Sequence, residues 1–397
     1  MTQTQSKNNR IIGLDMHPDV FAAAAVIGER ADSCMNEWVH DRQSTSELES
    51  WAKKHLRRDD IVVLEASGNS FEVAHVLGEL GYTTLVLESQ QAGKLQDNYC
   101  NDDKSSAVKL AKIYLTGMAK VVWQPDPKTR LNREVFFKHR NAVKDCTKHR
   151  NRIRSYLSDH CVRLPRGTSL TAPSGLQKAL SLRTWDALEI ELLSTMFEEL
   201  WFCEKQRKKM KKIMAMEVAN NDKMRPLLRI LGVNLITAFG LVAIIGDINR
   251  FSNPKKLVGY FGVAPRKKQS GNNKEGIKGG IGNGGRGDIR ALLVQGAQSA
   301  LKYNNNPFFA FGWRVLKRHS RNVAIGAIAR KMVVSIWYLL KRRYTPLLEV
   351  NVSLKEKLVK LASAIGLETV KNMGYSSSKE FIETMAEKLT FSEKILE

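Results

Sequence analysis

The sequence is poor in cysteine, and its cysteines lack the spacing that would make them metal ligands. Cys34, Cys100, Cys146, Cys161 and Cys203 include no CxxC pair and no Cys/His spacing typical of zinc sites. An odd and scattered set is also poorly suited to a disulfide framework. We therefore expect a protein of a reducing compartment, which excludes the disulfide-stapled secreted class.

Long apolar runs are missing as well. The longest run, near Leu241–Ile245, is far shorter than the roughly 20 residues that a membrane-spanning helix needs. The N-terminal segment MTQTQSKNNR is polar and has no apolar signal core. These features predict a cytoplasmic protein with no membrane partner.

Acidic residues are in deficit. The chain carries 63 Lys and Arg against 40 Asp and Glu, a formal net charge of +23 over 397 residues. The repulsion among so many positive charges is typical of proteins that bind a polyanion. We favour nucleic acid over an anionic membrane, because no segment has the amphipathic pattern and aromatic anchors of an interfacial helix. The length predicts two or three domains.

The first part of the chain alternates strand and helix patterns. Strand candidates at 11–26 (two strands joined by a turn), 61–65 and 82–87 alternate with helix candidates at 69–81 and 105–115. This alternation is typical of an α/β domain, which we place at residues 8–125.

A long basic helix follows, within a helical segment at residues 128–220. Its apolar or buried-type positions alternate in spacings of four and three, as in a coiled-coil seam: Val135, His139, Ala142, Cys146, His149, Ile153 and Tyr156. The other faces carry ten Lys and Arg between Lys128 and Arg154, against Glu134 and Asp145. This imbalance favours nucleic-acid contact through Arg150, Arg152 and Arg154. The alternative is an ordinary solvated face.

Acidic residues stand where two predicted strands end. Asp15 ends the first strand and Glu65 ends the 61–65 strand, while Asp102 and Asp103 precede a helix. In open α/β sheets such positions commonly carry site residues. Carboxylates gathered from neighbouring strands suit Mg²⁺, which polarises phosphoryl oxygens, and an RNase H-like domain is the natural candidate. The alternative is that Asp15 opens a turn and Asp103 caps a helix.

Residues 226–250 predict two helices joined by a turn at Leu231-Gly232-Val233. This pattern is typical of a helix-hairpin-helix, a unit that presents backbone amides to phosphate.

A glycine-rich basic segment occupies residues 265–290, with eight glycines between Gly271 and Gly287. Glycine allows close backbone approach to phosphate oxygens. Ser270 lies beside three cations, which would stabilise the charge that develops when a hydroxyl attacks a phosphodiester. The predicted nucleic-acid-binding cations are Arg266, Lys267, Lys268, Lys274, Lys278 and Arg286. The alternative is a flexible surface loop.

Taken in order, these segments resemble one family, the DEDD-type transposases of bacterial insertion sequences of the one-ten and one-eleven-eleven types, which are bridge-RNA-guided recombinases. The matching segments are Gly13-Leu14-Asp15, Leu64-Glu65-Ala66-Ser67-Gly68, Asp103 to Ala107, Ile230-Leu231-Gly232-Val233, Gly246-Asp247-Ile248, Gly262-Val263-Ala264-Pro265-Arg266, Ser270-Gly271, Arg286-Gly287-Asp288-Ile289-Arg290 and Asn322-Val323-Ala324-Ile325. They cover most of residues 10–345.

The resemblance implies a two-part enzyme. A RuvC-like, RNase H-fold domain would hold Mg²⁺ through Asp15, Glu65 and Asp103, and a C-terminal transposase domain would supply Ser270 as the nucleophile of a covalent phosphoserine link to DNA. The two centres would meet between protomers of a dimer or tetramer. A structured non-coding guide RNA would pair with donor and target DNA, so that base pairing reads the sequence.

The sequence departs from the family pattern at the fourth acid. The family spaces its last two acids Asp-x-x-Asp, whereas this chain has Asp103-Lys104-Ser105-Ser106. Ser106 could replace the missing ligand, since serine hydroxyls ligate Mg²⁺ in phosphate-binding loops. A three-acid site and a decayed element are the alternatives.

The predicted organisation is a RuvC-like domain at 8–125, a basic coiled-coil segment at 128–220, a transposase domain with the serine loop at 224–345 and a helical tail at 346–397. Two other functions stay open at this point. One is a metal-dependent nuclease or junction resolvase that uses the acids alone. The other is a catalytically decayed DNA- or RNA-binding protein.

Overall fold

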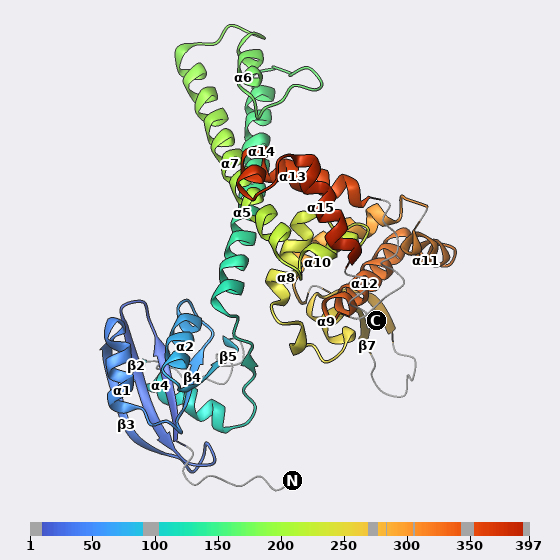
Figure 1. Ribbon diagram of the computed structural model, residues 1–397. Helices are drawn as coiled ribbons and strands as arrows, with labels where there is room; N and C mark the ends of the chain where they lie inside the picture. The colour runs from blue at the N-terminus through green and yellow to red at the C-terminus, as the bar shows by residue number, and fades with distance from the viewer. Residues whose placement is uncertain are drawn as a thin grey trace. The chain divides into compact units, whose positions relative to one another are not determined.

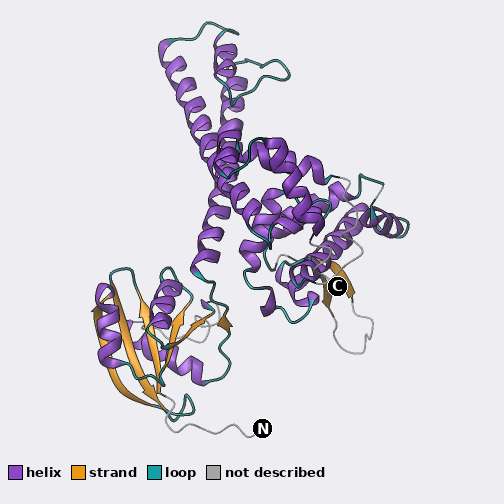
Figure 2. Cartoon of the chain, in the orientation of Figure 1, coloured by secondary structure: helices purple, strands orange, loops and turns teal. Residues whose placement is uncertain are grey.

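The computed structural model describes residues 10–89, 103–268, 277–282, 284–304, 306–342 and 353–391. The chain separates into two compact units, residues 1–128 and 129–397. The first is a layered α/β unit and the second is mainly helical (Figure 2). The predicted combination of an α/β domain with a helical region is therefore confirmed at this level.

A six-stranded mixed sheet forms the centre of the N-terminal unit, in the order β3-β2-β1-β4-β5-β6. The strands are β1 (Arg10–Met16), β2 (Val20–Ile27), β3 (Met35–Ser44), β4 (Ile61–Glu65), β5 (Thr83–Leu87) and β6 (Val121–Val122). β2 is antiparallel to β1 and β3, whereas β1, β4 and β5 are mutually parallel. The three strand regions predicted from sequence are confirmed. β3 was missed because none of its ten residues is buried, so it has no apolar pattern.

Helices cover both faces of this sheet (Figure 1). α1 (Leu48–His55) and α2 (Ser70–Glu79) pack against the face that carries Ile12 and Leu14. α4 (Asp103–Leu115) packs against the opposite face, which carries Ile11. Because side chains alternate along a strand, Gly13 and Asp15 share the α4 face with Ile11.

The contact between α4 and β1 is unusually close at Gly13. A Cβ built on Gly13 would lie 1.9 Å from the carbonyl oxygen of Ala107. On the neighbouring strand, the buried side chains of Ala22 and Ala24 pack with Ala107. Alanine is a poor strand former, so these residues are better explained by the room that they leave for α4.

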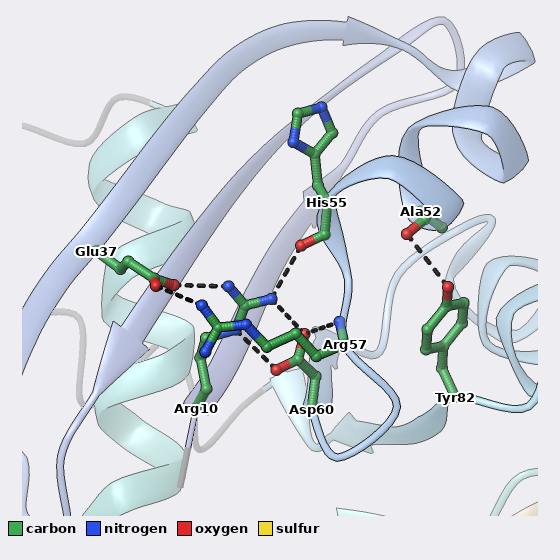
Figure 3. A network of polar contacts seen from close by, with 7 residues as sticks. All are labelled: Arg10, Glu37, Ala52, His55, Arg57, Asp60 and Tyr82. Atoms are coloured by element: carbon green, nitrogen blue, oxygen red, sulfur yellow. Dashed lines mark hydrogen bonds and ion pairs between the residues drawn. The ribbon is translucent and has the colours of Figure 1, made fainter. Parts of the chain in front are cut away.

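A buried ion-pair network fixes the start of β1 (Figure 3). The Arg10 guanidinium donates to both carboxylate oxygens of Asp60, at 2.8 and 2.7 Å, and to the His55 carbonyl at 2.9 Å. It also pairs with Glu37 on β3 at 2.6 Å, and Arg57 pairs with the same carboxylate at 2.8 Å. The network therefore ties β1, β3 and the connection between α1 and β4 together.

The helical unit begins with an antiparallel pair of long helices, α5 (Pro127–Asp159) and α7 (Ala187–Asn220), joined by a segment that contains α6 (Pro173–Leu180) (Figure 1). The predicted seam of α5 is confirmed: Cys146 and Ile153 are buried against Phe197 of α7. The partner of the seam is thus a helix of the same chain. His139 is also buried there, and burial, with the charges of Arg207 and Lys211, lowers its pKa to about 4.

The rest of this unit surrounds α8 (Leu235–Ile245), which is buried on nearly all sides. Around it lie η2 (Arg225–Arg229), η3 (Ile248–Arg250), α9 (Pro254–Tyr260), α10 (Gly287–Ala300), α11 (Pro307–Leu316) and α12 (Arg321–Leu340), with a hairpin of β7 (Pro265–Lys268) and β8 (Ile277–Ile281). The helix-hairpin-helix prediction is wrong for its first helix. That segment, η2, is a five-residue 3₁₀ turn that contains Pro226, and it is too short for the predicted α-helix.

The C-terminal helices pack into the same core. They are α13 (Leu354–Ile365), α14 (Leu367–Asn372) and α15 (Ser378–Phe391), and they bury Leu361 and Met385 in the cluster around α8. The Lys357 ammonium donates to the carbonyls of Leu228 and Ile230, at 2.7 Å each, and burial lowers its pKa to about 8. The four-segment division of the sequence stays a prediction.

Within the described part of the chain, α12 is the one helix long and apolar enough to span a membrane by length and composition. Half of its apolar window is buried, and Ile328, Met332 and Ile336 belong to the core around α8. Packing in this core accounts for its composition.

The Asp60→Asn variant tests the ion-pair network. The substitution keeps the size of the side chain but leaves the buried Arg10 charge without its bidentate partner, so the free energy of unfolding should fall by about 3–5 kcal/mol. Urea unfolding measures the change. Lys53→Gln, which removes an exposed pair with Glu49, is the control and should cost less than about 0.5 kcal/mol. Equal, small effects of both variants would show that the network contributes nothing beyond a surface pair.

Candidate functional site

Asp15 and Glu65 lie side by side at one edge of the sheet. Leu14 and Leu64 are register partners in the parallel pair of β1 and β4, so the residue that follows each of them emerges at the same edge. Both carboxylates are partly buried. Burial raises the pKa of Glu65, and the negative charge of Asp15 raises it further. Two acids are therefore held together against their mutual repulsion.

The start of α4 reaches the same edge. Ala107 lies over Gly13, whereas Leu110, one turn later, packs with Ile11 and Val26, which are register partners nearer the other end of β1. α4 thus runs opposite to β1, and its first residue, Asp103, lies at the end of the sheet that carries Asp15 and Glu65.

Ser106 lies in the first turn of α4 and is partly buried. It is three residues from Asp103, a spacing that puts both positions on neighbouring parts of one helix surface. Among the described side chains, no group of three or more His, Cys, Asp or Glu forms a metal-binding cluster. The side chains of Asp15 and Glu65 therefore lie together at this edge. Asp103 is placed at the same edge by the position of its helix.

The predicted nucleophile lies outside the described residues: Ser270 and Lys274 belong to the segment 269–276 between β7 and β8. The other predicted cations of this segment are placed by their backbone. Arg266, Lys267 and Lys268 belong to β7 and Lys278 to β8, and Lys267 pairs in register with Lys278. The antiparallel pairing brings basic positions from both strands together.

Arg290 holds the base of this hairpin, a role that the sequence did not reveal. Its guanidinium donates to the carbonyls of Gly282 and Gly284, at 3.0 and 2.7 Å. Gly262 faces the same strand end with φ +65°, and a Cβ there would lie 2.1 Å from the Gly284 oxygen. Glycine is therefore required at position 262. The motif Arg286-Gly287-Asp288-Ile289-Arg290 contains this residue, but nothing in the motif indicates which groups Arg290 contacts.

Arg286, predicted to bind nucleic acid, has partners within the protein. It pairs with Asp288 at 2.6 Å, and its guanidinium carbon lies 5.5 Å from the ring centre of Phe137 on α5. Arg140, also on α5, lies 3.7 Å from the same Asp288 carboxylate. Burial and the charge of Arg286 lower the pKa of Arg140. These contacts link α5 to the start of α10.

The three predicted arginines of α5 differ in their surroundings. Arg150 forms a hydrogen-bonded ion pair with Glu204 of α7, a carboxylate that is only 5% exposed and that Arg207 also contacts, at 2.7 Å. Arg152 and Arg154 are exposed. Arg150 is therefore placed to hold the two helices together, whereas Arg152 and Arg154 are free to contact a partner as predicted.

Residues 224–311 match the sequence model of a family described as "Transposase IS116/IS110/IS902 family". This span contains α8, the β7–β8 hairpin and Arg290.

Three relatives cover most of the chain. It is 28% identical over 357 residues to "Transposase for insertion sequence element IS1111A" of Coxiella burnetii, and the aligned region spans 85% of this chain and 92% of that protein. It is 24% identical over 290 residues to "Probable family 20 transposase" of Pseudomonas aeruginosa (71% and 84%). It is 22% identical over 288 residues to "Transposase for insertion sequence element IS1328" of Yersinia enterocolitica (70% and 82%). The predicted enzyme class, a DNA transposase, is supported by the family match and by these relatives.

The Asp15→Asn variant tests the coupling of the carboxylate pair. Removing the Asp15 charge should lower the pKa of Glu65, although burial keeps it above the ordinary range. Glu65 holds its proton to higher pH in the folded than in the unfolded chain, so stability falls as the pH rises between these two pKa values. This fall should shrink in the variant. Carboxyl ¹³C NMR titration and thermal unfolding with EDTA measure both effects.

The control for this pair is Asp32→Asn, which changes an exposed carboxylate of the same unit. It should leave the titration of Glu65 unchanged. If Asp15→Asn behaves as this control does, the two carboxylates are not coupled.

A second prediction separates the arginines of α5. The double variant Arg152→Gln/Arg154→Gln should weaken binding to duplex DNA and to structured RNA and reduce the salt slope of duplex binding by about 0.9 for each lost phosphate contact. Arg150→Gln should instead lower the free energy of unfolding, by about 1–3 kcal/mol, because Glu204 loses a buried partner. An unchanged salt slope in the double variant would assign Arg152 and Arg154 to a solvated face.

Proposed function

We propose that this chain is a DNA transposase of the type that the family match describes, which excises and inserts an insertion sequence by cutting and rejoining DNA. The observation that carries the proposal is the coupled pair Asp15–Glu65 at adjacent strand ends, with the start of α4 at the same edge. A mixed sheet that gathers acids in this way supports an RNase H-like (RuvC-like) identity for the N-terminal unit.

The acidic edge is a suitable site for Mg²⁺. Its donors are oxygens, which hard cations prefer, and the mutual repulsion of Asp15 and Glu65 is relieved by a positive charge between them. Asp15, Glu65 and Asp103 would hold the ion, with Ser106 in the place of a fourth acid. When bound, the ion polarises a phosphoryl oxygen of the DNA.

In this mechanism Ser270 is the nucleophile of the C-terminal unit. Its hydroxyl oxygen attacks the scissile phosphorus, the bond between phosphorus and the leaving DNA oxygen breaks, and the serine proton is transferred to that oxygen, directly or through water. The product is a phosphoserine link, which the DNA hydroxyl of the new partner strand later displaces. Cations of β7 and β8 on either side of Ser270, among them Lys268 and Lys278, support this role by their charge.

The partners of the enzyme are donor and target DNA, a structured guide RNA that pairs with both, and further copies of the chain in a dimer or tetramer. The net charge of +23 supports a protein that holds several phosphate backbones. Acids of one protomer and Ser270 of another would then act on the same phosphate. The reaction takes place in the bacterial cytoplasm.

The deciding experiment is a search for an SDS-resistant protein–DNA adduct. The protein is expressed with its native flanking DNA and RNA, with and without Mg²⁺, beside Ser270→Ala. We expect an adduct that requires both Mg²⁺ and Ser270, and we expect Ser270→Ala to abolish strand exchange while nucleic-acid binding persists.

Other outcomes favour other functions. Cleaved DNA without an adduct, unaffected by Ser270→Ala, would favour a hydrolytic nuclease or junction resolvase that uses the acids alone. Tight, salt-sensitive binding with no cleavage under any metal would indicate a decayed catalyst. Strand exchange by the Ser270→Ala variant would refute the serine mechanism.

A further inference from the structure

Trp313 on α11 is the most exposed tryptophan of the protein. All seven tryptophans lie within the described residues, and Trp313, at 53%, is the only one classed as exposed. Its indole is parallel to the Phe309 ring, with an interplanar angle of 12° and 5.9 Å between centroids. About half of this large flat ring is in solvent, and that half is available to stack on a partner.

The rest of α11 holds this ring firmly in place. Phe308 and Gly312 are buried on the side of the helix that packs with α12. Trp313 comes directly after Gly312, and Phe309 lies one turn before Trp313. The stacked pair therefore lies along the edge of the buried face of α11. The aromatic surface is thus mounted on a packed helix and needs little ordering when it binds.

A second exposed aromatic residue lies just before α11. Tyr303 is 54% exposed, and the loop that carries it is held by Asn306. The Asn306 side-chain oxygen accepts from the Phe309 amide at 2.9 Å, and its amide nitrogen donates to the carbonyls of Ala300, at 3.1 Å, and of Tyr303. One buried side chain therefore fixes the loop and caps the helix.

The charge around these rings is of one sign. Residues 289–348 contain no Asp or Glu, whereas Lys and Arg recur throughout. Arg314, Lys317, Arg318 and Arg321 are exposed at the end of α11 and the start of α12, and none forms an ion pair with a described residue. Exposed aromatic rings beside unopposed cations are the features by which proteins bind single-stranded nucleic acid.

We propose that this surface of α11 binds unpaired nucleotides of a single-stranded nucleic acid. A base stacks on Trp313, and the adjacent phosphates are neutralised by Arg314, Lys317, Arg318 and Arg321. The inference rests on the proposed function in one respect, since a transposase handles strands that are unpaired during exchange. Stacking and phosphate contact are common to RNA and DNA, so the source of the strand is left to the experiment.

The test measures fluorescence anisotropy of labelled strands of about twelve nucleotides, a length within the usual site size, as single-stranded RNA, single-stranded DNA and duplex DNA. Trp313→Ala should weaken binding of single strands roughly 5- to 100-fold, with little change for duplex DNA, and Trp313→Phe should restore much of the loss. The double variant Lys317→Gln/Arg318→Gln should reduce the salt slope for single strands by about 1.4. The preferred strand identifies RNA or DNA as the source.

The matched control is Leu188→Ala, which removes the most exposed apolar side chain of α7 (79% exposed). Single-strand affinity equal in Trp313→Ala and in this control would overturn the inference. So would a change of oligomeric state in Trp313→Ala with unchanged strand binding, which would assign the surface to a protein interface. Circular dichroism confirms that each variant is folded.

The adduct assay separates this inference from the proposed function. If the wild-type protein forms the Ser270 adduct but Trp313→Ala binds single strands normally, the binding inference is wrong and the proposed transposase function is kept. If no adduct forms but binding of single strands still depends on Trp313, the proposed function is wrong and the inferred binding surface is kept.

Discussion

The packing of α4 on β1 at Gly13 is the contact on which the candidate catalytic edge depends. Strand pairing alone brings Asp15 and Glu65 together, but the third acid comes from a helix and needs a fixed point. That point is the Ala107 carbonyl, seated where a Cβ on Gly13 would otherwise stand. The absence of a methyl group at one position therefore sets where Asp103 begins its helix.

The excess positive charge is divided between two kinds of cation. Some are held in ion pairs inside the fold: Arg10 with Asp60, Arg150 with Glu204 and Arg286 with Asp288. The first two pairs join residues 50 and 54 positions apart in sequence, and they stabilise the packing of the elements that carry them. Others are exposed, including Arg152 and Arg154 of α5 and the four cations at the end of α11 and the start of α12. Net charge alone indicates a polyanionic partner, but only the fold shows which cations are available to it.

Apolar patterns predicted much of the architecture. β1, β2 and β4 were recognised because they are buried on both faces and appear as continuous apolar runs. The α5 seam was recognised by its spacing, although Phe136 and Leu157 are the buried residues where Val135 and Tyr156 were expected. Phe136 belongs to the core around α8, where it faces Gly240, so the N-terminal end of α5 has a different partner from the seam. At the other end a straight helix drifts relative to a strict seven-residue repeat, so the buried position moves to Leu157.

Two kinds of information were beyond the sequence. The pairing of Arg150 with Glu204 spans 54 residues, and no local pattern reports it. The leucines of the 3₁₀ turn at Arg225–Arg229 give an apolar pattern that predicts a helix, but they are buried by α8 and the C-terminal helices and not by a helical face of their own. In the candidate site, Asp15 and Glu65 could be predicted because residues at the ends of neighbouring parallel strands lie at the same edge of a sheet. The role of Arg290 could not be predicted, since its carbonyl partners are brought together only when the hairpin forms.

The small residues beneath α4 have a consequence for how this enzyme tolerates variation. Gly13, Ala22 and Ala24 on the strands and Ala107 on α4 itself bear no reactive group, yet a longer side chain at any of these positions would push the helix away from the sheet. In a saturation mutagenesis screen, inactivating alleles should cluster at these positions as well as at the carboxylates. The two groups would differ in kind: loss of an acid removes a carboxylate from an intact fold, whereas a methyl group at Gly13 moves the helix and leaves every carboxylate present.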